Sequence, residues 1–188
     1  MKIKEYKTST DDVVTSYQNV FSCAEREFML NFAVNSGYAF GSASSPVAKI
    51  MNLEPFFNCN FSLEDAERFG FNQSKFVQNL MADYELTGAW INATFPGNFH
   101  YHHTDNPVRP DIGAEKYTLM YNVNTIWDPS WGGEILFSNM LGETEIAIDF
   151  TPGQIIKFDS RLRHRSAFSH NHKMPRFQFV SQYIKKPT

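Results

Sequence analysis

Apolar side chains in the first part of the chain recur at the intervals typical of helices. Between Asp11 and about Asn35 they are spaced three, four and seven residues apart, which places them on one face of a helix. The stretches Ser62–Phe69 and Ser74–Tyr84 are also predicted to be helical, and the first of them begins Ser-Leu-Glu-Asp, a candidate capping box. Residues 1–88 are therefore predicted to be mostly helical.

After Gly88 the pattern changes to short aromatic or β-branched stretches that are separated by turn residues such as Pro152-Gly153. Each stretch has the length and composition of a strand, and many short strands at this spacing are typical of a barrel or a sandwich. Helices followed by strands predict an α+β protein in which the helices buttress one side of a β-barrel. The predicted strands are Ala89–Phe95, Phe99–Thr104, Tyr117–Val123, Glu134–Phe137, Glu145–Ile148, Gln154–Phe158, Arg163–Ala167 and Arg176–Tyr183.

The chain is predicted to be a single domain, because no repeat, low-complexity tract or linker divides residues 1–188. Residues 1–88 would form the support and residues 89–188 the barrel. Aromatic residues make up 15% of the chain and Phe alone occurs 18 times, so large rings are expected to fill the core.

Charge and cysteine usage narrow the classes of partner. The formal net charge of −3 argues against nucleic acid as the main partner. No stretch is apolar enough for a signal peptide or a membrane span. The two cysteines, Cys23 and Cys59, are too few for a disulfide framework. We therefore expect a cytoplasmic protein without a membrane partner.

Candidate chemistry is concentrated between Phe99 and Asp105, a stretch that contains three of the six histidines and a carboxylate. On a strand, His103 and Asp105 would point to the same face. His164, just beyond the predicted strand that ends at Phe158, is the best third ligand. Two histidines and one carboxylate leave three coordination positions open, which suits Fe(II) enzymes, whereas catalytic zinc usually needs only one.

This pattern has a simpler interpretation when it is taken alone. A His-x-Asp triplet is a weak signal, and His100, His102 and His103 could also lie on a solvated edge strand. The remainder of the chain favours the metal site.

Seven short motifs follow one another through the second half of the chain. In order they are Phe95-Pro96-Gly97-Asn98; His103-Thr104-Asp105-Asn106-Pro107; Tyr121-Asn122-Val123-Asn124 with Trp127-Asp128; Trp131-Gly132-Gly133-Glu134-Ile135 with Phe137; Pro152-Gly153 with Phe158; His164; and Arg176. In this order and spacing the sequence from Phe95 to Tyr183 resembles the Fe(II)/2-oxoglutarate-dependent dioxygenases, and within them the prolyl-4-hydroxylase-like branch.

The resemblance implies a double-stranded β-helix barrel of the jelly-roll or cupin-like kind, with iron at one mouth. It implies His103, Asp105 and His164 as the iron ligands and Arg176 as the partner of the distal carboxylate of 2-oxoglutarate. The rigid fork of an arginine suits such a carboxylate. Arg165 and Lys173 are weaker candidates for the same role.

The same family resemblance implies further pocket residues. Thr118 and Asn122 share a face of one predicted strand, and Ile135 would pack on the co-substrate. Many relatives have tyrosine at the position of Asn122, and some have it at Phe95, so the binding mode is expected to differ there. The pair Gly132-Gly133 is expected to form a tight turn or to allow a close backbone approach. Phe137, Ile156 and Phe158 would form an apolar wall.

The implied reaction is hydroxylation of a prolyl residue in a peptide or protein, coupled to decarboxylation of 2-oxoglutarate to succinate. It would use Fe(II), 2-oxoglutarate and dioxygen, with ascorbate as a reductant. Because Asp105 is present, hydroxylation is expected rather than the halogenation of relatives that lack this carboxylate. The segments Thr104–Lys116 and Phe40–Asn60 are candidate substrate lids.

Alternatives remain open from the sequence. The same chemistry could act on a free amino acid or another small metabolite, and the basic segment Ser160–Arg165 could favour an acidic one. A barrel of this architecture could instead bind a sugar or other small ligand without catalysis, and a zinc hydrolase is a third possibility. The oligomeric state is not predicted.

Overall fold

The computed structural model describes residues 1–42, 56–98, 100–105 and 115–187. Most of the two candidate lids, Thr104–Lys116 and Phe40–Asn60, lies outside these residues, as does Phe99.

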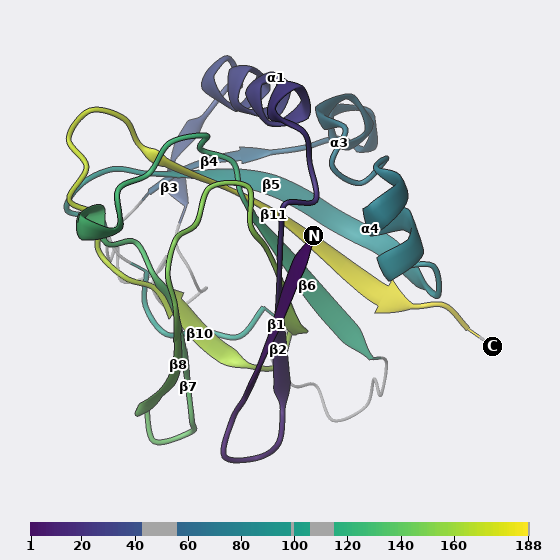
Figure 1. The fold of residues 1–188 in the computed structure, drawn as a ribbon, viewed down its shortest axis with the longest axis vertical. Coiled ribbons are helices and arrows are strands. Elements are labelled where there is room, and N and C mark those ends of the chain that lie inside the picture. Colours follow the sequence, from purple (N-terminus) through teal and green to yellow (C-terminus); the bar gives the residue numbers. More distant parts are fainter. Residues whose placement is uncertain (43–55, 99, 106–114, 188) are drawn as a thin grey trace.

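Two antiparallel sheets face each other across an apolar interior (Figure 1). In the described residues the small sheet contains β10 (Arg163–Ser166), β7 (Ile135–Ser138) and β8 (Thr144–Ile148), in that spatial order. The large sheet contains, again in spatial order, β1 (Lys2–Lys7), β2 (Val13–Gln18), β9 (Ile155–Asp159), β6 (Lys116–Asn122), β11 (Arg176–Lys185), β5 (Tyr84–Thr94), β4 (Phe56–Asn60) and β3 (Ala39–Ser42).

Three helices lie against the outer face of the large sheet, as the sequence predicted (Figure 1). They are α1 (Cys23–Val34), α3 (Leu63–Phe69) and α4 (Lys75–Leu80). The capping box at Ser62 is confirmed, with Asp65 as its acidic partner, and Ser22 forms a second one at α1. Among the described residues, no helix has the length and apolar character needed to cross a bilayer.

Side-chain alternation along the strands separates two cores. On β6, Leu119 and Tyr121 pack outward against the helices, whereas Met120 faces the interior between the sheets. Phe137 of the small sheet and Phe158 of the large sheet meet there at a ring-centroid distance of 5.0 Å. The predicted α+β barrel is confirmed. Its interior wall contains Phe137, Ile156 and Phe158, all at most 1% exposed.

The prediction of a mostly helical first half is wrong. Val13–Gln18 is strand β2, and helix α1 begins only at Cys23. Strand β2 pairs with β1 along its whole length and, from Thr15 to Tyr17, with β9, and pairing of this kind overrides helical periodicity. Asn19, which has a left-handed φ of 58°, then turns the chain towards the helix.

The prediction of a strand at Phe99–Thr104 is also wrong for its described residues. Only His103 forms a β-bridge there, with His164. The local contact there is between the ring of His103 and the carbonyl of Tyr101, which accepts a hydrogen bond from Nδ1. The other predicted strands are confirmed with shifted ends, and the helix predicted at Ser74–Tyr84 stops at Leu80 because Tyr84 begins β5.

Candidate metal centre

His103 and His164 lie directly opposite each other. The amide of His103 donates to the carbonyl of His164 at 3.0 Å, and the reverse hydrogen bond measures 2.9 Å. This reciprocal pairing brings the two rings to a centroid distance of 4.5 Å. Because His164 belongs to β10, the small sheet fixes the position of both imidazoles.

The two imidazoles are oriented in the same way. Nδ1 of His103 lies 2.8 Å from the carbonyl oxygen of Tyr101, and Nδ1 of His164 lies 2.9 Å from that of Leu162. A carbonyl oxygen only accepts, so each Nδ1 carries the proton and each Nε2 keeps a free lone pair. Nε2 of His164 is buried and has no hydrogen-bond partner. A metal ligand needs such a nitrogen.

Asp105 completes the cluster from the chain segment that follows His103. Its Oδ1 lies 3.6 Å from Nε2 of His103, and its Oδ2 lies 3.8 Å from Nε2 of His164. One ligand atom from each residue can be chosen so that all lie within 4.8 Å of one another. Both separations are too long for hydrogen bonds. Two imidazole nitrogens with free lone pairs and a carboxylate are ligands that divalent metals accept, so the donor set fits a divalent metal.

Burial keeps His164 neutral. The ring is fully buried against Phe137 and Phe158. Desolvation lowers the pKa of His164 to about 4, although Asp105 acts in the opposite direction. Neutral imidazole is the form that binds metal, so at neutral pH this ligand needs no deprotonation.

Arg176 is a fully buried cation at the start of β11. Its Nη1 donates to the carbonyl of Gly133 at 2.6 Å, while its Nε and Nη2 are buried and have no partner. Burial lowers the pKa of Arg176 to about 10, with Glu134 opposing, so the group still carries its charge at neutral pH. Two unpaired donors on one guanidinium fork fit a carboxylate.

The other two basic candidates are placed less favourably. Lys173 is exposed. Arg165 alternates with the buried His164 and Ser166 along β10, so it faces away from the barrel interior. Arg176 is therefore the residue that fits the predicted role.

Gly133 allows the close approach that the sequence predicts. Its φ is +87°, and a Cβ at this position would lie 3.1 Å from Cδ of Arg176. We expect Gly133→Ala to displace the guanidinium and to weaken 2-oxoglutarate binding by roughly tenfold, equivalent to about 1.4 kcal/mol. Isothermal titration with 2-oxoglutarate in the presence of Mn(II) measures this change.

Gly142 supplies a matched control for that substitution. It has the same φ of +87°, but a Cβ added there would meet no atom within 4 Å. Gly142→Ala should therefore cause similar backbone strain, about 1–3 kcal/mol, and leave 2-oxoglutarate binding unchanged. Equal binding by wild type and Gly133→Ala would contradict the role of Gly133.

The remaining predicted pocket residues line the barrel interior, but two of them have other partners. Ile135 is 2% exposed and belongs to the apolar wall. Nδ2 of Asn122 donates to the carbonyl of Thr151 at 3.1 Å and to Oε1 of Gln154 at 3.3 Å. Both amide hydrogens are thus used within the protein, which leaves neither of them for the co-substrate. The hydroxyl of Thr118 is directed at Asp105.

His100 is a buried residue near this site for which the sequence pattern indicated no separate role. Its ring stacks on Phe56 at 4.3 Å, and its Nε2 lies 3.4 Å from Oγ1 of Thr94. Burial, followed by the charge of Arg176, lowers the pKa of His100 well below 6.5. Thr94 is the cross-strand partner of Arg176. Only the strand register brings these groups together, and the sequence does not specify it.

The arrangement of the two sheets is that of a known fold. The chain has the double-stranded β-helix fold of the 2-oxoglutarate/Fe(II) oxygenases, as its structural neighbours show. The sequence itself matches no family model and no curated protein.

Three solved structures illustrate the similarity. An oxidoreductase of the 2OG-Fe(II) oxygenase family from Burkholderia pseudomallei aligns with a TM-score of 0.71 at 13% identity, over 92% of this chain and 86% of the other. HygX from Streptomyces hygroscopicus, solved with nickel and 2-oxoglutarate bound, gives 0.68 at 10% identity, over 92% and 83%. A Pseudomonas putida prolyl-4-hydroxylase gives 0.64 at 12% identity, over 95% of each chain.

Proposed function

We propose that this chain is an Fe(II)- and 2-oxoglutarate-dependent oxygenase. His103, Asp105 and His164 hold the metal, and Arg176 holds the distal carboxylate of 2-oxoglutarate. The observation that carries the proposal is a pair of unsatisfied sites in one barrel. One is a His-Asp-His cluster in which one ligand atom from each residue lies within 4.8 Å of the others and Nε2 of His164 is buried without a hydrogen-bond partner. The other is a buried arginine with two unpaired donors. A metal-bound 2-oxo acid would satisfy both.

Each part of the chain has a distinct task in this proposal. The carbonyls of Tyr101 and Leu162 accept hydrogen bonds from Nδ1 of the two histidines. The Nε2 atom of each histidine is therefore left to bind the metal. Arg176 orients the co-substrate by its charge and its fork. The apolar wall excludes water from the reacting groups. Iron and 2-oxoglutarate, when bound, supply the oxidising chemistry, with dioxygen as the oxidant and ascorbate as a reductant that keeps the metal ferrous.

For the substrate we propose a prolyl residue in a peptide or protein. Support comes from the motif order in the sequence and from the similarity to the Pseudomonas putida prolyl-4-hydroxylase over 95% of both chains. Hydroxylation of a free amino acid or another small metabolite is the alternative. The similarity to SnoK, a carbocyclase from nogalamycin biosynthesis, favours that alternative.

Succinate formation tests this proposal. The enzyme is incubated aerobically with Fe(II), 2-oxoglutarate and ascorbate, and prolyl peptides are compared with free amino acids as candidate substrates. Succinate that appears together with a product heavier by one oxygen atom identifies the substrate class. Turnover that persists without oxygen and 2-oxoglutarate would instead indicate a hydrolase. A protein that binds no metal and forms no succinate would be a non-catalytic barrel.

A further inference from the structure

Asp105 is held in a different way from the two histidines. His103 and His164 pair through their backbones, whereas Asp105 lies outside every strand of the described residues. Its carboxylate is tied to the large sheet by a side-chain contact, because Oγ1 of Thr118 donates to Oδ2 of Asp105 at 2.7 Å. Thr118 lies on β6, a central strand of that sheet, and is 0% exposed.

A second hydroxyl lies behind the first. Oγ of Ser160 lies 2.9 Å from Oγ1 of Thr118, and both side chains are buried. An ionised carboxylate has no proton to give, so the hydrogen of Thr118 must point to Asp105. Ser160 is then the donor to Thr118. The directions of both hydrogen bonds are therefore determined, running from Ser160 to Thr118 to Asp105.

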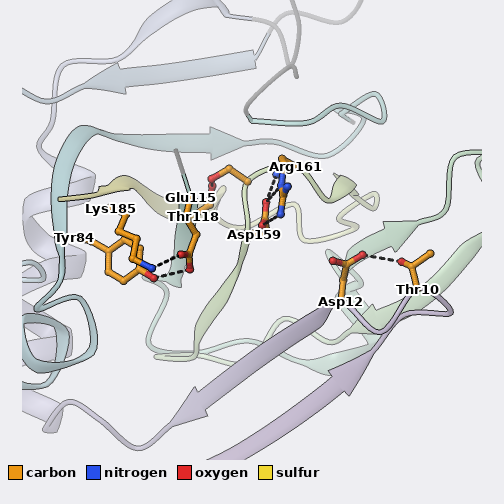
Figure 2. A network of polar contacts seen from close by, with 9 residues as sticks. Thr10, Asp12, Tyr84, Glu115, Thr118, Asp159, Arg161 and Lys185 are labelled. Carbon is orange, nitrogen blue, oxygen red and sulfur yellow. Dashed lines mark hydrogen bonds and ion pairs between the residues drawn. The ribbon is translucent and has the colours of Figure 1, made fainter. Parts of the chain in front are cut away.

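Ser160 is held in place by the strand pairing and by the turn that follows β9. Its amide donates to the carbonyl of Lys116 at 3.0 Å, which places it beside the start of β6. In the same turn, Arg161 binds the carboxylate of Asp159 through its backbone amide and its guanidinium, and Figure 2 shows this pair close to Thr118. The turn continues to Leu162, whose carbonyl orients the ring of His164. One short turn thus supports two of the three metal ligands.

We propose that Thr118 and Ser160 form a hydroxyl relay that fixes the orientation of the Asp105 carboxylate for metal binding. They are positioning residues, because neither belongs to the metal-ligand set. This inference rests on the proposed metal site. Chains of buried hydrogen bonds to a charged acceptor are strong and geometrically specific. Loss of a partner of this kind typically weakens metal binding by about 10–100-fold.

Three variants separate the relay from general packing. Thr118→Val keeps the shape of the side chain but removes the donor, Thr118→Ser keeps the donor, and Ser160→Ala removes the outer hydroxyl. Anaerobic titration with Fe(II), and with Co(II) read by its visible d–d absorption, measures affinity and ligand geometry without turnover. We expect Thr118→Val to raise the metal dissociation constant by about 10–100-fold and to change the Co(II) spectrum. Thr118→Ser should retain the metal dissociation constant and the Co(II) spectrum of the wild type.

The outcomes distinguish the relay from the metal site itself. The relay is overturned if Thr118→Val binds metal as tightly as wild type with the same spectrum, or if Thr118→Ser is as impaired as Thr118→Val. If Thr118→Val does not fold, Ser160→Ala decides, and an unchanged affinity and spectrum in that variant overturn the relay. If wild type binds no metal at all, the proposed function fails and the relay with it.

Discussion

Replacing Arg176 with methionine is expected to raise the dissociation constant of 2-oxoglutarate by on the order of 10²–10⁴-fold. The two unpaired donors of the guanidinium, Nε and Nη2, are the ones available to a carboxylate. Each charge-assisted hydrogen bond contributes about 1.5–3 kcal/mol, and every 1.4 kcal/mol is about tenfold in affinity. Titration of 2-oxoglutarate into the Mn(II)-loaded protein measures the effect.

The same substitution should leave the ligand-free protein folded. Burial without an ion-pair partner among the described residues already disfavours the charge of Arg176, and a buried charge of this kind contributes little net stability. The unfolding temperature of Arg176→Met should therefore stay within about 2–4 °C of wild type. Arg68→Met, an exposed arginine on α3, is the control and should bind 2-oxoglutarate normally. Normal binding by Arg176→Met would contradict the assigned role.

Replacing His164 with alanine is expected to lower Fe(II) affinity by about 10²-fold or more, because loss of an outer partner alone costs about 10–100-fold. His164 is fully buried, and its Nε2 has no protein partner. That nitrogen is therefore able to bind a metal. Anaerobic calorimetry with Fe(II) measures the change, and the exposed His170 supplies the control substitution His170→Ala. If both alanine variants bind iron as wild type does, His164 is not a ligand.

Much of the barrel could be predicted because its strands carry local signals. Short alternating stretches that end at Gly and Pro turns identified β6 to β11 within a few residues of their ends. The candidate metal ligands were recognisable for a similar reason, since a His-x-Asp pair and a distant histidine occur in a family-like order. Arg176 was implied by the same resemblance, which expects a basic residue on the last core strand.

The first half of the chain was harder to predict because the spacing of its apolar residues fits both a helix and a strand. Val13–Gln18 contains apolar residues at helical spacing, yet it forms β2 through its pairing with β1 and with β9. The contact with β9 joins residues about 140 positions apart in the chain, and no local pattern reports it. The strand predicted at Phe99–Thr104 is absent from its described residues, where His103 forms an isolated bridge with His164 and its ring donates to the carbonyl of Tyr101.

Contacts across strands account for the rest of the site. The hydrogen bond from Thr118 to Asp105 depends on where the segment after His103 meets β6. The amide of Asn122 is used by Thr151 and Gln154 because of the register between β6 and the turn before β9. Sequence spacing placed these residues on the correct face of the strand, but it could not identify their partners.

The most direct test of the metal and co-substrate site is anaerobic addition of Fe(II) and 2-oxoglutarate, followed by visible absorbance. If His103, Asp105 and His164 leave room for a chelating 2-oxo acid and Arg176 anchors its far end, a weak metal-to-ligand charge-transfer band should appear in the green region. The band should be lost in His103→Ala and weakened in Arg176→Met. Iron that binds tightly without producing this band would contradict the assignment of 2-oxoglutarate as co-substrate.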